Sequence, residues 1–294
     1  MGNLSASDLA FTGFRIVRER PKVVATWAVL RFLLIIGLGL FMVTTGGPAL
    51  AQFQALAHQT PPNPAASVAL FRSLAPTYAV AMLVSLVVEP VLLAAMNRVV
   101  LRPEPVGFAY LRFGSDELLQ FILLVLVFLL VVGIYIGLII AGVAIGLVVG
   151  FTAKAALPVI IPLVMVGVFA AGIYLAVRLS LASAITFDTG RVSLFRSWAL
   201  TRGRFWTLLG TYLLTVALLL VLAMMAMVVI VPIVFVAAGG FSGLAAALKP
   251  NMSSIGLFLT PALILFQVLW AVFSAVAGAV WLTVPAGIYR ELKA

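Results

Sequence analysis

Two apolar runs of 34 residues each constrain this chain more than any other feature. They cover residues 118–151 and 205–238 of the 294-residue sequence. A helix of that length is about 51 Å long, whereas the hydrocarbon core of a bilayer is about 30 Å thick. The runs therefore predict transmembrane helices that tilt, protrude or break, and they exclude an ordinary soluble domain.

Four more apolar segments predict further spans, at residues 23–44, 76–100, 156–181 and 255–288. Only 9% of the residues are charged, against about 25% in soluble proteins. The first apolar segment could also be interpreted as a signal peptide, because Ala49-Leu50-Ala51 resembles a cleavage site. Its apolar run is longer than a signal peptide's and contains Arg31, so we expect an uncleaved helix. The expected fold class is all-α, a polytopic membrane domain of six helices spanning residues 1–294.

The basic residues predict the orientation of the spans. The net charge is +10, and positive charge is typical of cytoplasmic loops. One side of the predicted topology has only Arg72, Lys154 and Lys249, one in each loop. The other side carries most of the remainder, and both termini are therefore expected in the cytoplasm. The basic residues on this cytoplasmic side are Arg15, Arg18, Arg20, Lys22, Arg98, Arg102, Arg112, Arg191, Arg196, Arg202, Arg204, Arg290 and Lys293.

A pattern of one amphipathic segment followed by two spans repeats three times along the chain. A short basic amphipathic segment precedes spans 1, 3 and 5, at residues 8–20, 107–113 and 192–202. Each is followed by an outgoing and a returning span. We therefore predict three tandem helical hairpins, in units 1–100, 101–187 and 188–294. Residues 45–75 are the longest predicted external segment, and we expect them to form a small helical hairpin loop.

The densest run of charge lies between spans 4 and 5. Asp188, Thr189 and Gly190 suggest a turn, and three-and-four spacing predicts an amphipathic helix over residues 192–201. Such a helix lies in the membrane surface. It either anchors the topology or contacts anionic lipid headgroups. The basic and aromatic residues of this interfacial segment are Arg191, Arg196, Trp198, Arg202, Arg204 and Trp206.

Residues 178–210 also carry a family resemblance. The order Arg-Leu-Ser-Leu-Ala, a turn, and Phe-Arg-Ser-Trp-Ala-Leu-Thr-Arg-Gly-Arg-Phe-Trp-Thr-Leu-Leu-Gly resembles the membrane domain of bacterial glycerophosphoryl diester phosphodiesterases. It is also similar to related stand-alone inner-membrane proteins. The resemblance implies a bacterial inner-membrane location. The family's catalytic barrel has no counterpart in this sequence, so phosphodiesterase activity is not expected.

Three charged residues fall inside predicted spans: Arg31, Glu89 and Arg178. Charges in hydrocarbon are costly and mark candidate functional sites. Each of the three lies nine or ten residues from a cytoplasmic end, so we expect one cluster. It could be an Arg31–Glu89 pair that aligns spans 1 and 2, a headgroup site formed by the two arginines, or a proton-linked carboxylate.

Small residues on span 3 predict close helix packing. Glycine residues spaced by about one helical turn let helix backbones approach one another in lipid. The candidate packing residues are Gly133, Gly137, Gly142, Gly146 and Gly150.

The composition argues against enzyme chemistry. The chain has no cysteine and a single histidine, His58, and it contains no phosphate-binding loop. We expect no catalytic residues, no cofactor, no metal site and no nucleic-acid partner. The leading hypothesis is a non-enzymatic membrane protein that contacts anionic lipid headgroups or another amphiphile, a membrane protein partner or second copy of itself, or both. The alternative is a small proton-linked transporter that uses Glu89.

Overall fold

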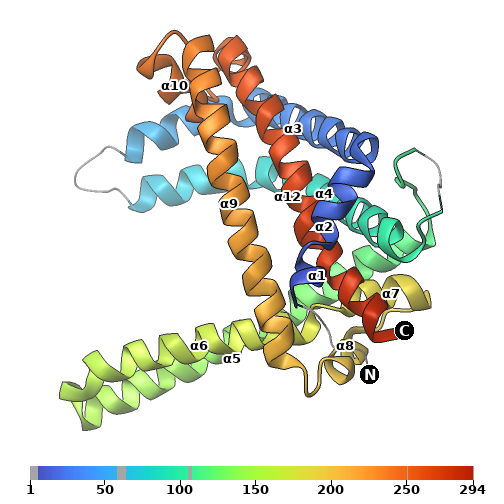
Figure 1. The fold of residues 1–294 in the computed structure, drawn as a ribbon. Coiled ribbons are helices and arrows are strands. Elements are labelled where there is room, and N and C mark those ends of the chain that lie inside the picture. Colours follow the sequence, from blue (N-terminus) through green and yellow to red (C-terminus); the bar gives the residue numbers. More distant parts are fainter. Residues whose placement is uncertain (1–5, 58–63, 105–107, 250, 294) are drawn as a thin grey trace.

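The computed structural model describes residues 6–57, 64–104, 108–249 and 251–293, and every regular element in these ranges is a helix. Six helices in the described part of the chain are long and apolar enough to cross a membrane. This confirms the prediction of a multi-pass helical chain. The six are α3 (Pro21–Ala57), α4 (Pro64–Leu101), α5 (Ser115–Thr152), α6 (Leu157–Leu179), α9 (Phe205–Ala237) and α12 (Pro261–Lys293) (Figure 1).

Short helices join the long ones. Helix α2 ends at Glu19 and α3 begins at Pro21, because proline is tolerated in the first turn of a helix, where its missing N–H has no partner to lose. The short elements are α1 (Ala6–Ala10), α2 (Thr12–Glu19), the 3₁₀ turn η1 (Lys154–Ala156), α7 (Ala182–Thr189), α8 (Leu194–Leu200), α10 (Phe241–Leu248) and α11 (Ile255–Phe258).

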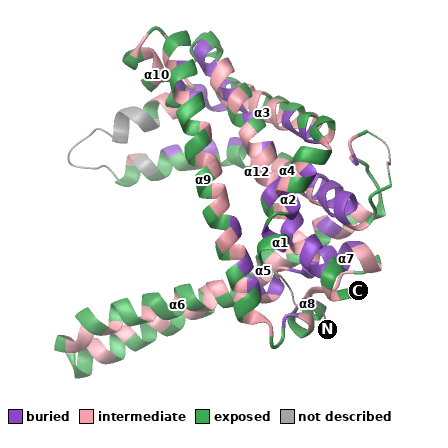
Figure 2. Cartoon of the chain, in the orientation of Figure 1, coloured by how far each residue is buried: buried purple, intermediate pink, exposed green. Residues whose placement is uncertain are grey.

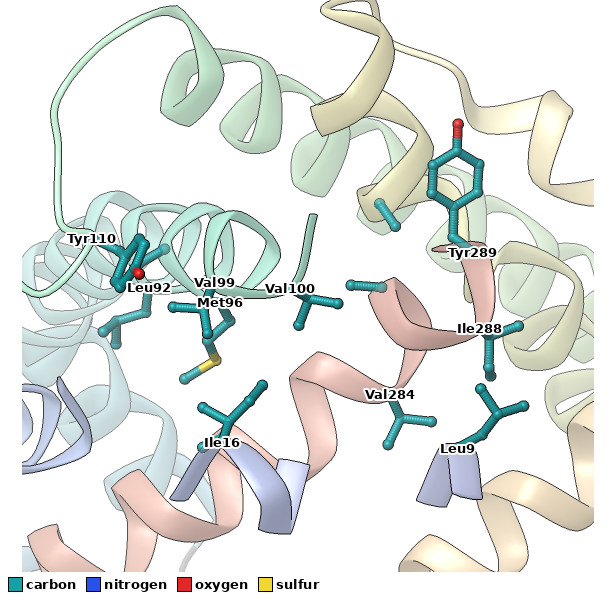
Figure 3. Close-up of a cluster of buried hydrophobic side chains, with 14 of the residues drawn as sticks. Leu9, Ile16, Leu92, Met96, Val99, Val100, Tyr110, Val284, Ile288 and Tyr289 are labelled. Atoms are coloured by element: carbon teal, nitrogen blue, oxygen red, sulfur yellow. The ribbon is translucent and has the colours of Figure 1, made fainter. Parts of the chain in front are cut away.

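The largest buried cluster lies where six helix ends meet, and we call this region the hub. It gathers the N-terminal ends of α3 and α9 and the C-terminal ends of α4, α6 and α12. The start of α5 is buried beside α4 and α7. Helices α1 and α2 pack on α9 and α12. Figure 3 shows part of the cluster, in which Met96 and Ile16 from two different helices point toward one another.

Away from the hub, the long helices separate. Figure 2 shows buried residues concentrated around the hub and exposed residues along the α5–α6 pair, which runs out from it. None of the most apolar stretch of α6 is buried. Two small clusters join the far ends of α9, α10 and α12, and of α3, α11 and α12. The largest buried cluster is thus at one end of the helices, and lipid can cover the apolar faces that have no protein partner.

The predicted helical hairpin loop at residues 45–75 is wrong in its boundaries. Helix α3 continues through Pro48 to Ala57, and α4 already begins at Pro64. The helical parts of this segment are thus extensions of the two long helices. Proline is tolerated within such helices because side chains and local adjustments satisfy the freed backbone groups. The expected tip at residues 58–63 lies outside the described residues.

The predicted amphipathic segment before span 3 is not a helix over its described residues, 108–113. Ala109 and Tyr110 instead adopt left-handed conformations, with φ of 52° and 62°, which cost about 1–3 kcal/mol each outside glycine. Hydrogen bonds from the hub hold this turn. Trp27 Nε1 donates to the Ala109 carbonyl at 3.0 Å, and Arg98 Nη1 donates to that of Tyr110 at 2.6 Å.

Candidate headgroup site and its surroundings

The break between α6 and α7 is stabilised by a serine from α8. Ser197 Oγ donates to the Arg178 carbonyl at 2.6 Å and accepts from the Leu181 backbone N–H at 3.2 Å. Ser197 is fully buried. It thereby satisfies two backbone groups that the interrupted helix cannot pair. This contact fixes α8 against the end of α6.

The same contact places Arg178 on an aromatic surface. Its guanidinium carbon lies 5.1 Å from the ring centre of Tyr174 and 5.6 Å from that of Trp198. Its Nη1 donates to Thr201 Oγ1 at 3.3 Å. We call Arg178, Tyr174, Trp198 and Thr201 the Arg178 platform. Cation–π contacts of this kind are worth about 0.5–2 kcal/mol, so they orient the guanidinium without neutralising it.

Arg178 has no carboxylate within ion-pair distance among the described residues. Its Nε atom is also buried without a hydrogen-bond partner. A guanidinium offers five N–H donors, and among the residues that the structure describes only Thr201 accepts from one of them. The platform is therefore an oriented cation with free donors, which is the chemistry that binds an oxyanion.

Arg31 and Glu89 form an ion pair, and Arg178 forms no ion pair with Glu89. Arg31 Nη1 is 3.8 Å from Glu89 Oε1. Arg31 also packs across α12, because a Cβ atom added at Gly278 would lie 3.2 Å from its Nη2. The Glu89 side chain is 46% exposed, whereas that of Arg31 is 18% exposed. The sequence therefore predicted one cluster where the structure has a pair and a separate arginine.

The interfacial segment folds as α8, shorter than the predicted helix. Its hydroxyl groups face inward, since Ser197 and Thr201 are fully buried, while the side chain of Phe195 is exposed. Trp206, at the start of α9, is also exposed. Exposed aromatic side chains at a helix end are typical of membrane interfaces. The basic side chains at Arg191, Arg196 and Arg202 are exposed, and Arg204 is half-buried.

Asp188 lies in the last turn of α7 and not in the predicted turn. Gly190 ends that helix in a left-handed conformation with φ of 63°, which glycine adopts without strain. Asp188 Oδ2 accepts hydrogen bonds from Tyr289 Oη at 2.8 Å and Lys293 Nζ at 2.7 Å. The carboxylate therefore ties α7 to the end of α12.

The hub contains a buried polar network that the sequence did not predict. Arg98 Nη2 lies 2.7 Å from Glu117 Oε1 and 3.2 Å from Asp116 Oδ2. Nearby, Asn97 donates to Ser183 Oγ, which donates to Gln120 Oε1, both at 2.8 Å. In the sequence, Asp116 and Glu117 have the pattern of acidic residues in the first turn of a helix. Gln120, one turn after Glu117, was a signal that this helix start faces protein and not water.

The five glycine residues of α5 differ in whether another helix of the chain packs against them. A Cβ atom added at Gly133, Gly137 or Gly146 would meet no described atom within 4 Å. At Gly142 it would lie 3.1 Å from Val164 Cγ1, and at Gly150 4.0 Å from Leu157 Cδ1. Packing within the chain explains Gly142, whereas for the first three close helix packing stays a prediction. Helix α6 contacts α5 along one face, and these three glycine residues have open space beside them.

No group of three or more His, Cys, Asp or Glu side chains in the described ranges could hold a metal ion. The charged clusters are ion pairs between helices, not ligand sets. In comparisons with known proteins, the chain matches no family model, no curated protein and no solved structure.

Proposed function

We propose that this chain is an integral membrane protein that binds the phosphate headgroup of an anionic phospholipid at the Arg178 platform. The observation that carries the proposal is that the Arg178 guanidinium is held in place without a carboxylate partner. It is oriented by two aromatic rings and one hydroxyl group, and no described carboxylate is within ion-pair distance of it. An arginine left alone within a membrane helix is costly. A phosphate diester offers the missing charge and acceptors in a geometry that matches guanidinium.

The surroundings of the platform support a headgroup ligand. Arg178 lies in the last turn of α6, at a helix end where lipid phosphates are within reach. Exposed aromatic side chains of Phe195 and Trp206 lie in adjoining elements. Basic residues on both sides of α8 add an attraction for anionic lipid of about 1 kcal/mol each near the surface. The hydroxyl group of Thr201 provides a further polar contact.

The topology belongs to the same proposal. The six helices form three tandem hairpins, the hub faces the cytoplasm, and the membrane is the inner membrane of a bacterium. Contacts between α3 and α4, α5 and α6, and α9 and α12 support the hairpins. The excess of Lys and Arg near the hub supports the orientation. The resemblance of residues 178–210 to the phosphodiesterase membrane domain is consistent with a lipid-binding, non-enzymatic role.

Lipid titration tests the proposal. Detergent-purified protein is delipidated and titrated with phosphatidylglycerol, and Trp198 serves as the fluorescent reporter after Trp206, Trp270 and Trp281 are replaced by phenylalanine. The buried Trp27 is kept, because its indole donates to the Ala109 carbonyl. We expect saturable quenching or a spectral shift with phosphatidylglycerol and little change with phosphatidylcholine. Arg178→Gln should weaken the response at least tenfold, whereas Arg72→Gln, at an exposed arginine of α4 outside the interfacial segment, should change it less than threefold. An equal response of both variants would overturn the proposal.

A further inference from the structure

A cavity on the opposite side of α6 from α8 has a chemistry unlike that of the Arg178 platform. It has a volume of about 370 Å³ and lies where α4, α6, α7, α9 and α12 meet. That volume is within the range of small-molecule sites, about 300–1,000 Å³. Its polar lining consists of Asn97, Ser180, Ser183 and Tyr212, and no charged residue lines it. The site therefore suits a neutral ligand.

The polar groups that line the cavity differ in how fully they are hydrogen-bonded. Ser183 is engaged with Asn97 and with Gln120, and Ser180 Oγ donates to the Val177 carbonyl at 2.8 Å. The Tyr212 hydroxyl lies beside Ser180. It is buried, and although Ser180 is near enough to interact with it, Ser180 Oγ donates its own proton to the Val177 carbonyl and the two hydroxyl groups are not in hydrogen-bonding geometry. A buried hydroxyl group without a partner costs about 1–3 kcal/mol, so a ligand oxygen that accepts its proton would be stabilised.

The rest of the cavity is apolar and reaches the surface. Leu209 and Leu282 line it, and Trp281 forms part of its rim. The rings of Tyr212 and Trp281 lie 6.0 Å apart, and Trp281 is 41% exposed. Tyr212 lies seven residues into α9, about 10 Å along that helix. A ligand entering from the bilayer could place its head beside Tyr212 and its chain along the exposed faces of α6 and α9.

We propose that this cavity is a second lipid site, which binds an uncharged amphiphile whose head carries a hydroxyl or ester oxygen, as in a diacylglycerol. The Tyr212 hydroxyl donates to that oxygen, and the apolar walls hold the first part of an acyl chain. This site is independent of the Arg178 platform, because its ligand is neutral and its lining residues are different.

Photolabelling tests the assignment. The probe is a diacylglycerol with a diazirine in one acyl chain, added to the purified full chain, and labelled peptides are mapped by mass spectrometry. We expect labels on α6, α9 and α12 near the cavity. Unlabelled diacylglycerol should compete, and phosphatidylglycerol should not. Arg178→Gln should leave the labelling unchanged, which separates this site from the headgroup site.

Two variants test where the probe binds and which group donates a hydrogen bond to it. Ala176 lines the cavity and is exposed, so Ala176→Trp can obstruct the site without requiring space in the core, and it should abolish the labelling. Tyr212→Phe removes one oxygen atom and should weaken probe binding about three- to tenfold. The matched control is Tyr78→Phe, at an exposed tyrosine of α4. Unchanged labelling in Ala176→Trp would overturn the cavity assignment. Unchanged affinity in Tyr212→Phe would overturn the role of its hydroxyl.

Discussion

Arg98 Nη2 lies 2.7 Å from Glu117 Oε1, and both side chains are at most 5% exposed. This ion pair joins the end of α4 to the start of α5 inside the hub. The guanidinium also lies 5.4 Å from the ring centre of Phe187 in α7, so three helices meet at one cation. Desolvated pairs of this kind are held by geometry, and the loss of one partner leaves the other charge buried.

Glu117→Gln should therefore lower the free energy of unfolding by about 3–5 kcal/mol. Replacing both partners, as in Arg98→Met with Glu117→Leu, should restore much of that loss, because no charge is then stranded. Chemical unfolding in detergent micelles measures both. The control is Lys293→Ala, which breaks a pair whose lysine is 60% exposed and should cost no more than about 1 kcal/mol. Equal losses in Glu117→Gln and the control would contradict the account.

Breaking the Arg31–Glu89 pair between α3 and α4 should also lower stability. Glu89→Gln should destabilise the protein by about 2.5–3.5 kcal/mol, the cost of an uncompensated arginine on membrane-insertion scales. Adding Arg31→Met should recover part of the loss. Thermal unfolding of the single and double variants measures the coupling. If Glu89 instead serves proton-linked transport, Glu89→Gln would leave stability unchanged.

Helix α2 approaches α12 closely at Gly13. A Cβ atom added at Gly13 would collide with the backbone of Val280. Gly13→Ala should thus cost about 1–3 kcal/mol, despite the better helix propensity of alanine. The matched control is Gly37→Ala in α3, where a Cβ atom would meet nothing within 4 Å; it should be neutral or stabilising by up to about 1 kcal/mol. Melting-temperature shifts of the same sign in both variants would refute this packing.

The orientation is testable because the chain contains no cysteine. A cysteine introduced at Lys249 should react in intact cells with a membrane-impermeant maleimide. Cysteine residues at Arg112 and Arg196 should react only after the inner face is opened, since both lie on the side rich in basic residues. Labelling of either one in intact cells would contradict a cytoplasmic hub.

The spans were predictable because hydropathy and helix length follow directly from the bilayer. The matched depth of Arg31 and Glu89 also indicated a pair that the structure has. The role of Ser197 could not be foreseen, because its partners belong to the break between α6 and α7. Likewise, Glu117 has the pattern of a helix cap, and only the position of α4 makes it an ion-pair partner. Local patterns specify elements, whereas side-chain partners depend on how distant elements pack.

Retention of native lipid tests the central claim most directly. Protein purified gently from its own membrane is analysed by native mass spectrometry, with wild type, Arg178→Gln and Arg31→Gln compared at equal detergent. The account predicts that wild type and Arg31→Gln retain an anionic phospholipid, because Arg31 is already paired with Glu89, and that Arg178→Gln loses it. Equal retention by Arg178→Gln and wild type would contradict the account.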